Sequence, residues 1–156
     1  MPVRVQQEDF DVSRELACLR AGNRSVGAVV AFIGTVRDIN ENAAVATMTL
    51  EHYPGMTEKA LVAIIDAAKS RWDIIDALII HRVGALAPSD QIVLVGVSGA
   101  HRGEAFAACE FIVDYLKTRA PLWKKEDTAE GARWVEARAT DDTAAARWQV
   151  PREPAK

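Results

Sequence analysis

Residues 91–119 read QIVLVGVSGAHRGEAFAACEFIVDYLKTR, and the spacing of their apolar residues changes partway through. The run over 91–98 is almost entirely apolar and β-branched, as in a strand that is buried on both faces. From 103 to 118 the apolar residues recur at helical spacing, which predicts a helix with one buried face. The predicted stripe on that face consists of Phe106, Cys109, Val113 and Leu116. A buried strand is therefore expected to lead directly into an amphipathic helix.

The same two periods continue on both sides of this unit. Apolar or alternating runs predict strands at 3–7, 26–36, 45–53 and 74–83, and a hairpin formed by 122–126 and 133–137. Helical spacing predicts helices at 11–20 and 57–71 and a last helix ending near 148, with Asp11 and Asp141 as caps. Residues 84–90 are interpreted as a turn. This order predicts an α+β fold in which helices pack on a mixed sheet.

The length of 156 residues fits one domain, expected over 1–150, followed by a tail at 151–156. Nineteen basic residues against 22 acidic ones give a net charge of -3, which argues against a general nucleic-acid binder. No apolar run is long enough for a membrane span, and the acidic N-terminus is unlike a signal peptide. Cys18 and Cys109 lie in apolar stretches and are interpreted as reduced core residues of a cytoplasmic protein.

Basic side chains gather at the ends of the predicted elements, where sites in such sheets are commonly found. They are Arg37, His101, Arg102, Lys117, Arg119, Lys124 and Lys125. Together with the free N–H groups at the start of the 103–118 helix, they could form one anion pocket. Solvated charges that complement helix dipoles are the alternative. If Lys117 and Lys124 share a cleft, each lowers the pKa of the other, as in a lysine that acts as a base or a covalent amine.

The remaining candidate groups point to no further chemistry. The three histidines lie too far apart for a known metal motif, so a site formed by them and Glu51 is disfavoured and no metal is expected. His52 and His81 are interpreted as core or hydrogen-bonding residues. No nucleophile elbow, dinucleotide fingerprint or P-loop occurs. The four tryptophans are interpreted as core or interface anchors.

Several phrases of the sequence resemble the large, catalytic subunits of molybdopterin synthases. They are GAVVAFIGTVRD (27–38), LEHYPGMTEKA (50–60), HRVG (81–84), AHR (100–102), YLKTRAPLWKKE (115–126) and RWVEA (133–137). They follow one another in the family's order and cover most of 26–148. The phrase at 115–126 is long and unusual, which makes the resemblance specific.

The resemblance implies an α/β hammerhead fold with a small antiparallel subdomain. It also implies a homodimer that carries a small ubiquitin-like sulfur-carrier subunit at each end, which makes a heterotetramer. The carrier's C-terminal thiocarboxylate would donate sulfur to cyclic pyranopterin monophosphate (precursor Z). Two such transfers form the dithiolene of molybdopterin, so the implied activity is that of a sulfurtransferase. No metal or redox cofactor is required for the transfer itself.

The family's functional positions correspond to a defined set of residues in this chain. The implied catalytic residues are Lys117 and Lys124, and the implied substrate-binding residues are Thr35, Val36, Arg37, His101, Arg102, Lys117, Lys124, Lys125 and Glu126. The chain departs from the family at Gly99, where a serine is common, and in the loop at 38–44. Two other functions stay open: a non-catalytic module that binds a ubiquitin-like tail, and an enzyme that acts on another phosphorylated metabolite.

Overall fold

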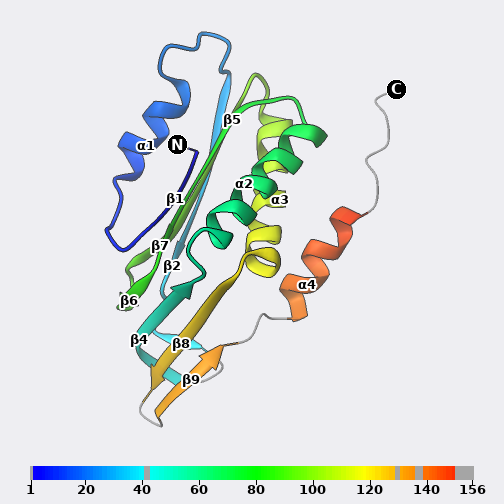
Figure 1. Cartoon of the computed structure of the whole chain (residues 1–156). Coiled ribbons are helices and arrows are strands. Elements are labelled where there is room, and N and C mark those ends of the chain that lie inside the picture. Colours follow the sequence, from blue (N-terminus) through cyan, green and yellow to red (C-terminus); the bar gives the residue numbers. More distant parts are fainter. Residues whose placement is uncertain (1, 41–42, 129–130, 136–138, 150–156) are drawn as a thin grey trace.

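The computed structural model of this chain describes residues 2–40, 43–128, 131–135 and 139–149, and it has the predicted α+β fold (Figure 1). In chain order the elements are β1 (Val3–Gln6), α1 (Val12–Arg20), β2 (Ala28–Thr35), β3 (Ile39–Asn40), β4 (Ala43–His52), α2 (Met56–Arg71), β5 (Ile74–Arg82), β6 (Gly84–Leu86), β7 (Gln91–Gly99), α3 (Arg102–Arg119), β8 (Leu122–Thr128), β9 (Gly131–Val135), α4 (Ala139–Ala146) and the 3-10 turn η1 (Arg147–Gln149). The predicted tail at 151–156 lies outside the described residues.

The sheet that we call the larger one, because three of its four strands have eight or nine residues, has the order β1-β5-β7-β2, in which only β1 and β5 run parallel. Within the described residues the other sheet has five strands, most of them shorter. Alternate side chains of β5 and β7 point to opposite faces, and both faces are covered. Ile79 and Val95 pack against α2 and α3, whereas Ile80 and Leu94 belong to a smaller apolar cluster that includes Leu19 of α1. Figure 1 shows the same layers, with α1 on one side of the sheet and α2 and α3 on the other.

A second sheet, with the order β3-β4-β8-β9, lies at one end of the molecule (Figure 1). The predicted hairpin is confirmed, although its strands are β8 and β9 and its turn joins Thr128 to Gly131. The interpretation of 84–90 as a turn is wrong in its first half, because residues 84–86 pair with β4 as strand β6. A three-residue strand carries no period of its own, so the sequence gives no local signal for it.

Four side-chain interpretations are wrong in whole or in part. Phe106 is 60% exposed, because the buried stripe of α3 runs through Ala105, Ala108, Cys109, Ile112 and Leu116. Cys18 is exposed, since α1 turns Leu19 toward the sheet. Trp123 is 47% exposed, so it is not a core anchor, and its interpretation as an interface anchor stays a prediction. Asp141 lies inside α4, which begins at Ala139, three residues before the first helical residue that an Asp141 cap would allow. Among the described residues, no helix is long and apolar enough to cross a membrane.

Candidate functional site

Two predicted catalytic lysines lie around a buried histidine where the larger sheet meets the smaller one. Lys117 belongs to the last turn of α3, and Lys124 lies in β8 just after the connection from that helix. Both lysines are half-buried. Their charges, and that of His52 in β4, lower the pKa of His81 at the end of β5. We call Lys117, Lys124, His81 and His52 the basic cluster. Its members come from four different elements.

A buried threonine fixes the corner between α3 and β8. The Thr57 hydroxyl accepts a hydrogen bond from the N–H of Tyr53 and donates one to the carbonyl oxygen of Pro121, both at 2.9 Å. Thr57 is fully buried at the start of α2, so these bonds are shielded from water. They tie the end of β4 and the start of β8 to one helix. From the sequence alone, Thr57 is predicted only as the start of a helical period.

His81 is neutral in this environment. Its side chain is 3% exposed, and Nδ1 lies 2.8 Å from the carbonyl oxygen of Arg82. A carbonyl oxygen only accepts hydrogen bonds, so Nδ1 carries the proton and Nε2 has a free lone pair. Burial, the largest cause, and the charges of Lys124, Lys117 and His52 together lower the pKa of His81 to about 4, against the opposing effect of the hydrogen bond to the Arg82 carbonyl. This confirms the expectation that His81 is a hydrogen-bonded core residue.

The low pKa of His81 predicts a loss of stability in acid. The unfolded chain protonates this residue below its ordinary pKa of about 6.5, while the folded chain does so only near 4. Between those values the unfolded state binds more protons, so lowering the pH favours unfolding by up to about 3 kcal/mol. Urea unfolding of the wild type and of His81→Asn between pH 7.5 and pH 4 measures this. The variant should lose clearly less stability than the wild type, and parallel losses would contradict the assignment.

The other predicted residues of β8 follow strand alternation. Lys124 and Glu126 share one face, and Lys125 lies on the opposite face. Glu126 is 4% exposed and pairs in register with Met48 of β4. Lys125 pairs with Thr49 and is half-buried. On this geometry Glu126 lies on the side of the strand that carries the candidate catalytic lysine.

Thr35, Val36 and Arg37 lie at the same end of the larger sheet as His81. Thr35 and Arg37 are exposed, whereas Val36 is buried in the core that includes Leu50. The Val36 N–H donates to the carbonyl oxygen of Asp90 at 2.9 Å, and its own carbonyl accepts from the N–H of Ser89 at 2.8 Å. Val36 therefore anchors the end of β2 and fixes where Arg37 leaves the sheet.

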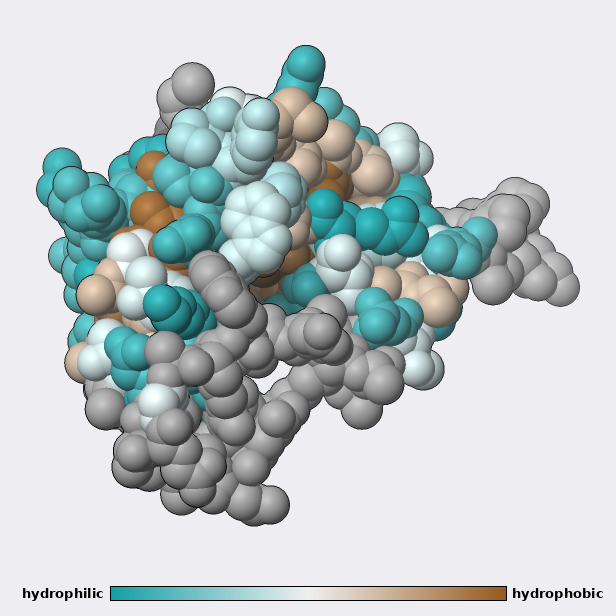
Figure 2. All heavy atoms as spheres, turned by 60° about the horizontal axis from the view of Figure 1, so that its bottom comes forward, coloured by the Kyte–Doolittle hydropathy of each residue, from teal (hydrophilic) through white to brown (hydrophobic). Residues whose placement is uncertain are grey.

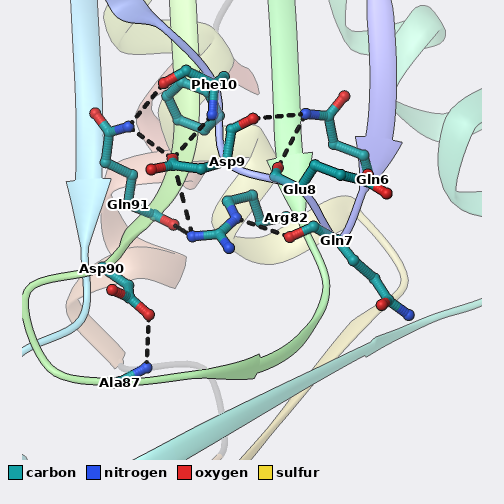
Figure 3. A network of polar contacts seen from close by, with 9 residues as sticks. All are labelled: Gln6, Gln7, Glu8, Asp9, Phe10, Arg82, Ala87, Asp90 and Gln91. Carbon is teal, nitrogen blue, oxygen red and sulfur yellow. Dashed lines mark hydrogen bonds and ion pairs between the residues drawn. The ribbon is translucent and has the colours of Figure 1, made fainter.

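A polar network next to His81 holds this end of the sheet together (Figure 3). Arg82 donates to the carbonyl oxygens of Gln7 and Gln91, both at 3.0 Å, and lies 3.9 Å from the carboxylate of Asp9. The Gln91 side chain also donates to Asp9, which lowers the pKa of that carboxyl group. Because Gln91 pairs with Thr35, the network links the strand of His81 to the strand that leads to Arg37.

His101 and Arg102 lie at the opposite end of the sheet. They follow β7, whereas Thr35 pairs with the first residue of that strand. Nine residues of β7 separate the two ends by about 27 Å, and α3 separates Arg102 from Lys117 by about 22 Å. These cations therefore do not all converge on one pocket within a single chain. Spacing along the chain placed them at element ends without telling which end of the sheet each one occupies.

His101 and Arg102 form the exposed start of α3. His101 is the N-cap residue and makes no side-chain capping bond, so its ring and the Arg102 guanidinium are both presented to solvent at the positive end of the helix. Gly27 approaches this segment closely and donates its N–H to the carbonyl oxygen of Gly99 at 2.9 Å. This end of the sheet is suited to an anion such as a phosphate.

The close approach at Gly27 predicts a clear effect of adding one methyl group. A Cβ at this position would lie 2.2 Å from the carbonyl oxygen of Ala100, so the backbone beside His101 must move. We expect Gly27→Ala to cost about 1–3 kcal/mol in urea unfolding. Gly103→Ala is the matched control, because a Cβ there meets nothing within 4 Å and the position is helical. It should be neutral or stabilising by about 0.4–1 kcal/mol, and equal losses in both variants would refute the close-contact argument.

The end of the molecule that carries the smaller sheet is mixed in character. In Figure 2 hydrophilic side chains alternate there with smaller apolar patches, without one continuous apolar area among the coloured residues. Within the described ranges no three His, Cys, Asp or Glu side chains are grouped so that they could hold a metal ion. Two half-buried lysines and a neutral imidazole are the groups that the structure brings together at this end.

Known proteins with related sequences and folds show the family of this chain. The model of the MoaE protein family matches residues 5–119. A molybdopterin synthase catalytic subunit from Ralstonia nicotianae is 68% identical over 148 residues, which is 95% of this chain and 84% of that protein. The molybdopterin biosynthesis MoaE protein from Burkholderia ambifaria has a similar structure, with a TM-score of 0.82 and 59% identity over 95% of this chain and 97% of that one. A complex of subunits 1 and 2 of molybdopterin-converting factor from Helicobacter pylori, at 19% identity and a TM-score of 0.72 over 88% of this chain and 92% of that one, shares the fold.

Proposed function

This chain belongs to the MoaE family of molybdopterin synthase catalytic subunits, and we propose that its basic cluster is where sulfur is transferred. The chain is an enzyme subunit that acts in the biosynthesis of the molybdenum cofactor. Its sulfur donor is the thiocarboxylated C-terminus of a small ubiquitin-like subunit, and its acceptor is cyclic pyranopterin monophosphate (precursor Z). Two transfers give the dithiolene of molybdopterin.

The observation that carries the site assignment is the placement of Lys117 and Lys124 around the neutral His81. Attack by a thiocarboxylate builds negative charge on the intermediate, and preorganised cations in a half-buried site stabilise such charge. Lys124 supplies this stabilisation. Lys117 transfers protons or acts as an amine toward the tail carbonyl. Glu126, on the same face of β8 as Lys124, and Lys125, on the opposite face, complete this part of the substrate site.

The cyclic phosphate of the substrate is held by Arg37, His101, Arg102 and the start of α3, with Thr35 and Val36 beside Arg37. Because His101 and Arg102 lie about 22 Å or more from Lys117 along α3, they serve the basic cluster of a second copy of the chain. The working unit is therefore a homodimer with one small subunit at each end. The Helicobacter pylori complex contains two different subunits, one of which shares the fold of this chain. This supports the pairing of a large with a small chain.

The transfer requires no metal or redox cofactor from this chain, because sulfur arrives already activated as a thiocarboxylate. We place the reaction in the cytoplasm, where reduced thiols such as Cys109 persist.

The test combines the chain with thiocarboxylated small subunit and precursor Z and measures molybdopterin. Product should form with this chain and with Lys59→Ala, a variant of an exposed lysine on α2. Binding of the small subunit without any affinity for the pterin would instead show a non-catalytic binding module. Failure to use the pterin while another phosphorylated metabolite reacts would show a different enzyme.

A mixing experiment tests the shared site. Lys117→Ala and Arg102→Ala protomers are each inactive or nearly so, but a mixed dimer contains one site with both residues intact. Random re-association of equal amounts should therefore recover about one quarter of wild-type activity. No recovery in a mixture that demonstrably exchanges protomers would mean that each site is built from one chain.

A further inference from the structure

A hydrogen bond to the backbone orients the ring of His81 and leaves one of its two nitrogens unprotonated. Nδ1 donates to the carbonyl oxygen of the next residue, Arg82, at 2.8 Å, which sets the tautomer. Nε2, on the other side of the ring, is then a hydrogen-bond acceptor. Residues 77, 79 and 81 of β5 share the face that packs under α2 and α3, so the ring lies on the side from which α3 and β8 bring their lysines.

Most of the charged and titratable groups around this ring are basic. Lys117 comes from α3, Lys124 from β8 and His52 from β4. The acidic groups on the surrounding elements include Glu58 of α2, whose carboxylate lies 3.6 Å from Nε2 of His52, and the buried Glu126, which shares the face of β8 that carries Lys124. Two neighbouring ammonium groups that are half-buried lower each other's pKa, which works against keeping both charged. A neutral acceptor between them works in the opposite direction.

We propose that His81 is a positioning residue that accepts a hydrogen bond at Nε2 from the Lys117–Lys124 pair and keeps both ammonium groups charged and aimed at the reacting centre. This proposal rests on the proposed function only for the consequence it has on sulfur transfer. The effect on the lysines themselves is a property of the chain alone. The Arg82 carbonyl is also required, because the hydrogen bond that it accepts keeps the proton on Nδ1 and leaves Nε2 unprotonated.

Two substitutions separate the two nitrogens of the ring. In His81→Asn the amide N–H₂ can replace the Nδ1 donor to the Arg82 carbonyl, but no atom reaches the position of Nε2. In His81→Gln the longer side chain can place its amide oxygen near that position, but the donor to the backbone is lost. The first variant removes the acceptor and retains the backbone bond, and the second does the reverse.

The first measurement follows the ε-CH₂ resonances of ¹³C-labelled lysines against pH in the full chain, with Lys117→Arg and Lys124→Arg used for assignment. In His81→Asn the pKa of at least one of the two lysines should fall by about one unit, because a charge-assisted hydrogen bond is lost. In His81→Gln both pKa values should stay within a few tenths of the wild type. The ¹⁵N spectrum of His81 in the wild type should show Nε2 unprotonated at pH 7. A protonated Nε2, or unchanged lysine pKa values in His81→Asn, would overturn the proposal.

The second measurement is single-turnover molybdopterin formation with saturating small subunit. His81→Asn should be slower by 10-fold or more with little change in KM, and the alkaline limb of its pH–rate profile should move to lower pH. His81→Gln should remain close to the wild type in rate, although it is the less stable of the two. A purely structural histidine gives the opposite order, because the rate would then follow stability. If the lysine pKa values shift as expected but Lys117→Ala remains active, the positioning role stands and the proposed catalytic role of the lysines fails.

Discussion

Lys117→Ala should nearly abolish molybdopterin formation, with a loss of about 10²–10⁴-fold in the single-turnover rate. Lys117 is the member of the basic cluster that is held on a helix, so its ammonium group has a defined position relative to His81. Removing one cation from the last turn of a helix costs only a few tenths to about 1 kcal/mol of stability. The variant should therefore fold and bind the small subunit normally. Circular dichroism and a pull-down with the small subunit check both points.

Two lysine variants serve as controls for this result. Lys125→Ala changes the neighbour of Lys124 on the opposite face of β8 and should lose much less activity. Lys59→Ala changes an exposed lysine on α2 and should leave the rate unchanged. Near-normal turnover by Lys117→Ala would show that the basic cluster only binds substrate and that proton transfer or attack on the tail is performed elsewhere.

Phe111→Ala should cost about 3–5 kcal/mol of folding free energy, the largest stability effect expected here. The ring is fully buried in α3, with its centroid 5.3 Å from the Trp72 ring, 5.7 Å from the Trp148 ring and 4.3 Å from the Tyr115 ring. The guanidinium of Arg71 also lies 5.1 Å from its centroid. Phe111 thus joins α2, α3 and η1, and its removal leaves a cavity where three elements meet.

Phe106→Ala is the matched control, since it removes the same side chain from the same helix at a position that is 60% exposed. We expect a change within about 0.5 kcal/mol. Both variants are unfolded with urea at one fixed protein concentration, because assembly would otherwise shift the midpoint. Tryptophan fluorescence should also change in Phe111→Ala, since Trp148 loses a neighbour. Equal losses in the two variants would mean that the buried aromatic contacts contribute little.

Much of the fold could be predicted from the sequence, because long elements carry their own period. The run at 91–98 and the helix at 103–118 became β7 and α3 with their ends displaced by one residue at most. Asp11 caps α1 as expected, through a hydrogen bond from the N–H of Arg14 at 3.1 Å. Strand β6 was missed because it exists only through its pairing with β4, which is a long-range contact. The orientation of Phe106 was missed because an apolar residue can satisfy a helical period and still lie at the edge of the buried stripe.

The candidate site was predicted as a set of residues but not as a place. The types and spacing of Lys117 and Lys124 could be taken from one continuous phrase, and the structure brings both to His81. The distance of Arg102 from them depends on the direction of β7 and α3 in the sheet, which no local pattern contains. His81 itself was predicted only as a hydrogen-bonded core residue. Its tautomer follows from a backbone carbonyl that only the three-dimensional structure places beside it.

The two cysteines, which are the only ones in the sequence, offer a route to spectroscopy. Cys18 is exposed on α1, while Cys109 is buried in α3 and burial raises its pKa to about 11. A maleimide or methanethiosulfonate reagent reacts with thiolates, so at neutral pH it should modify Cys18 and leave Cys109 untouched. One spin label per chain is then introduced without any engineered residue. Because α1 covers the face of the larger sheet that is opposite to α2 and α3, the label stands apart from the basic cluster, and pulsed dipolar measurements between two labels can report how copies of the chain are arranged.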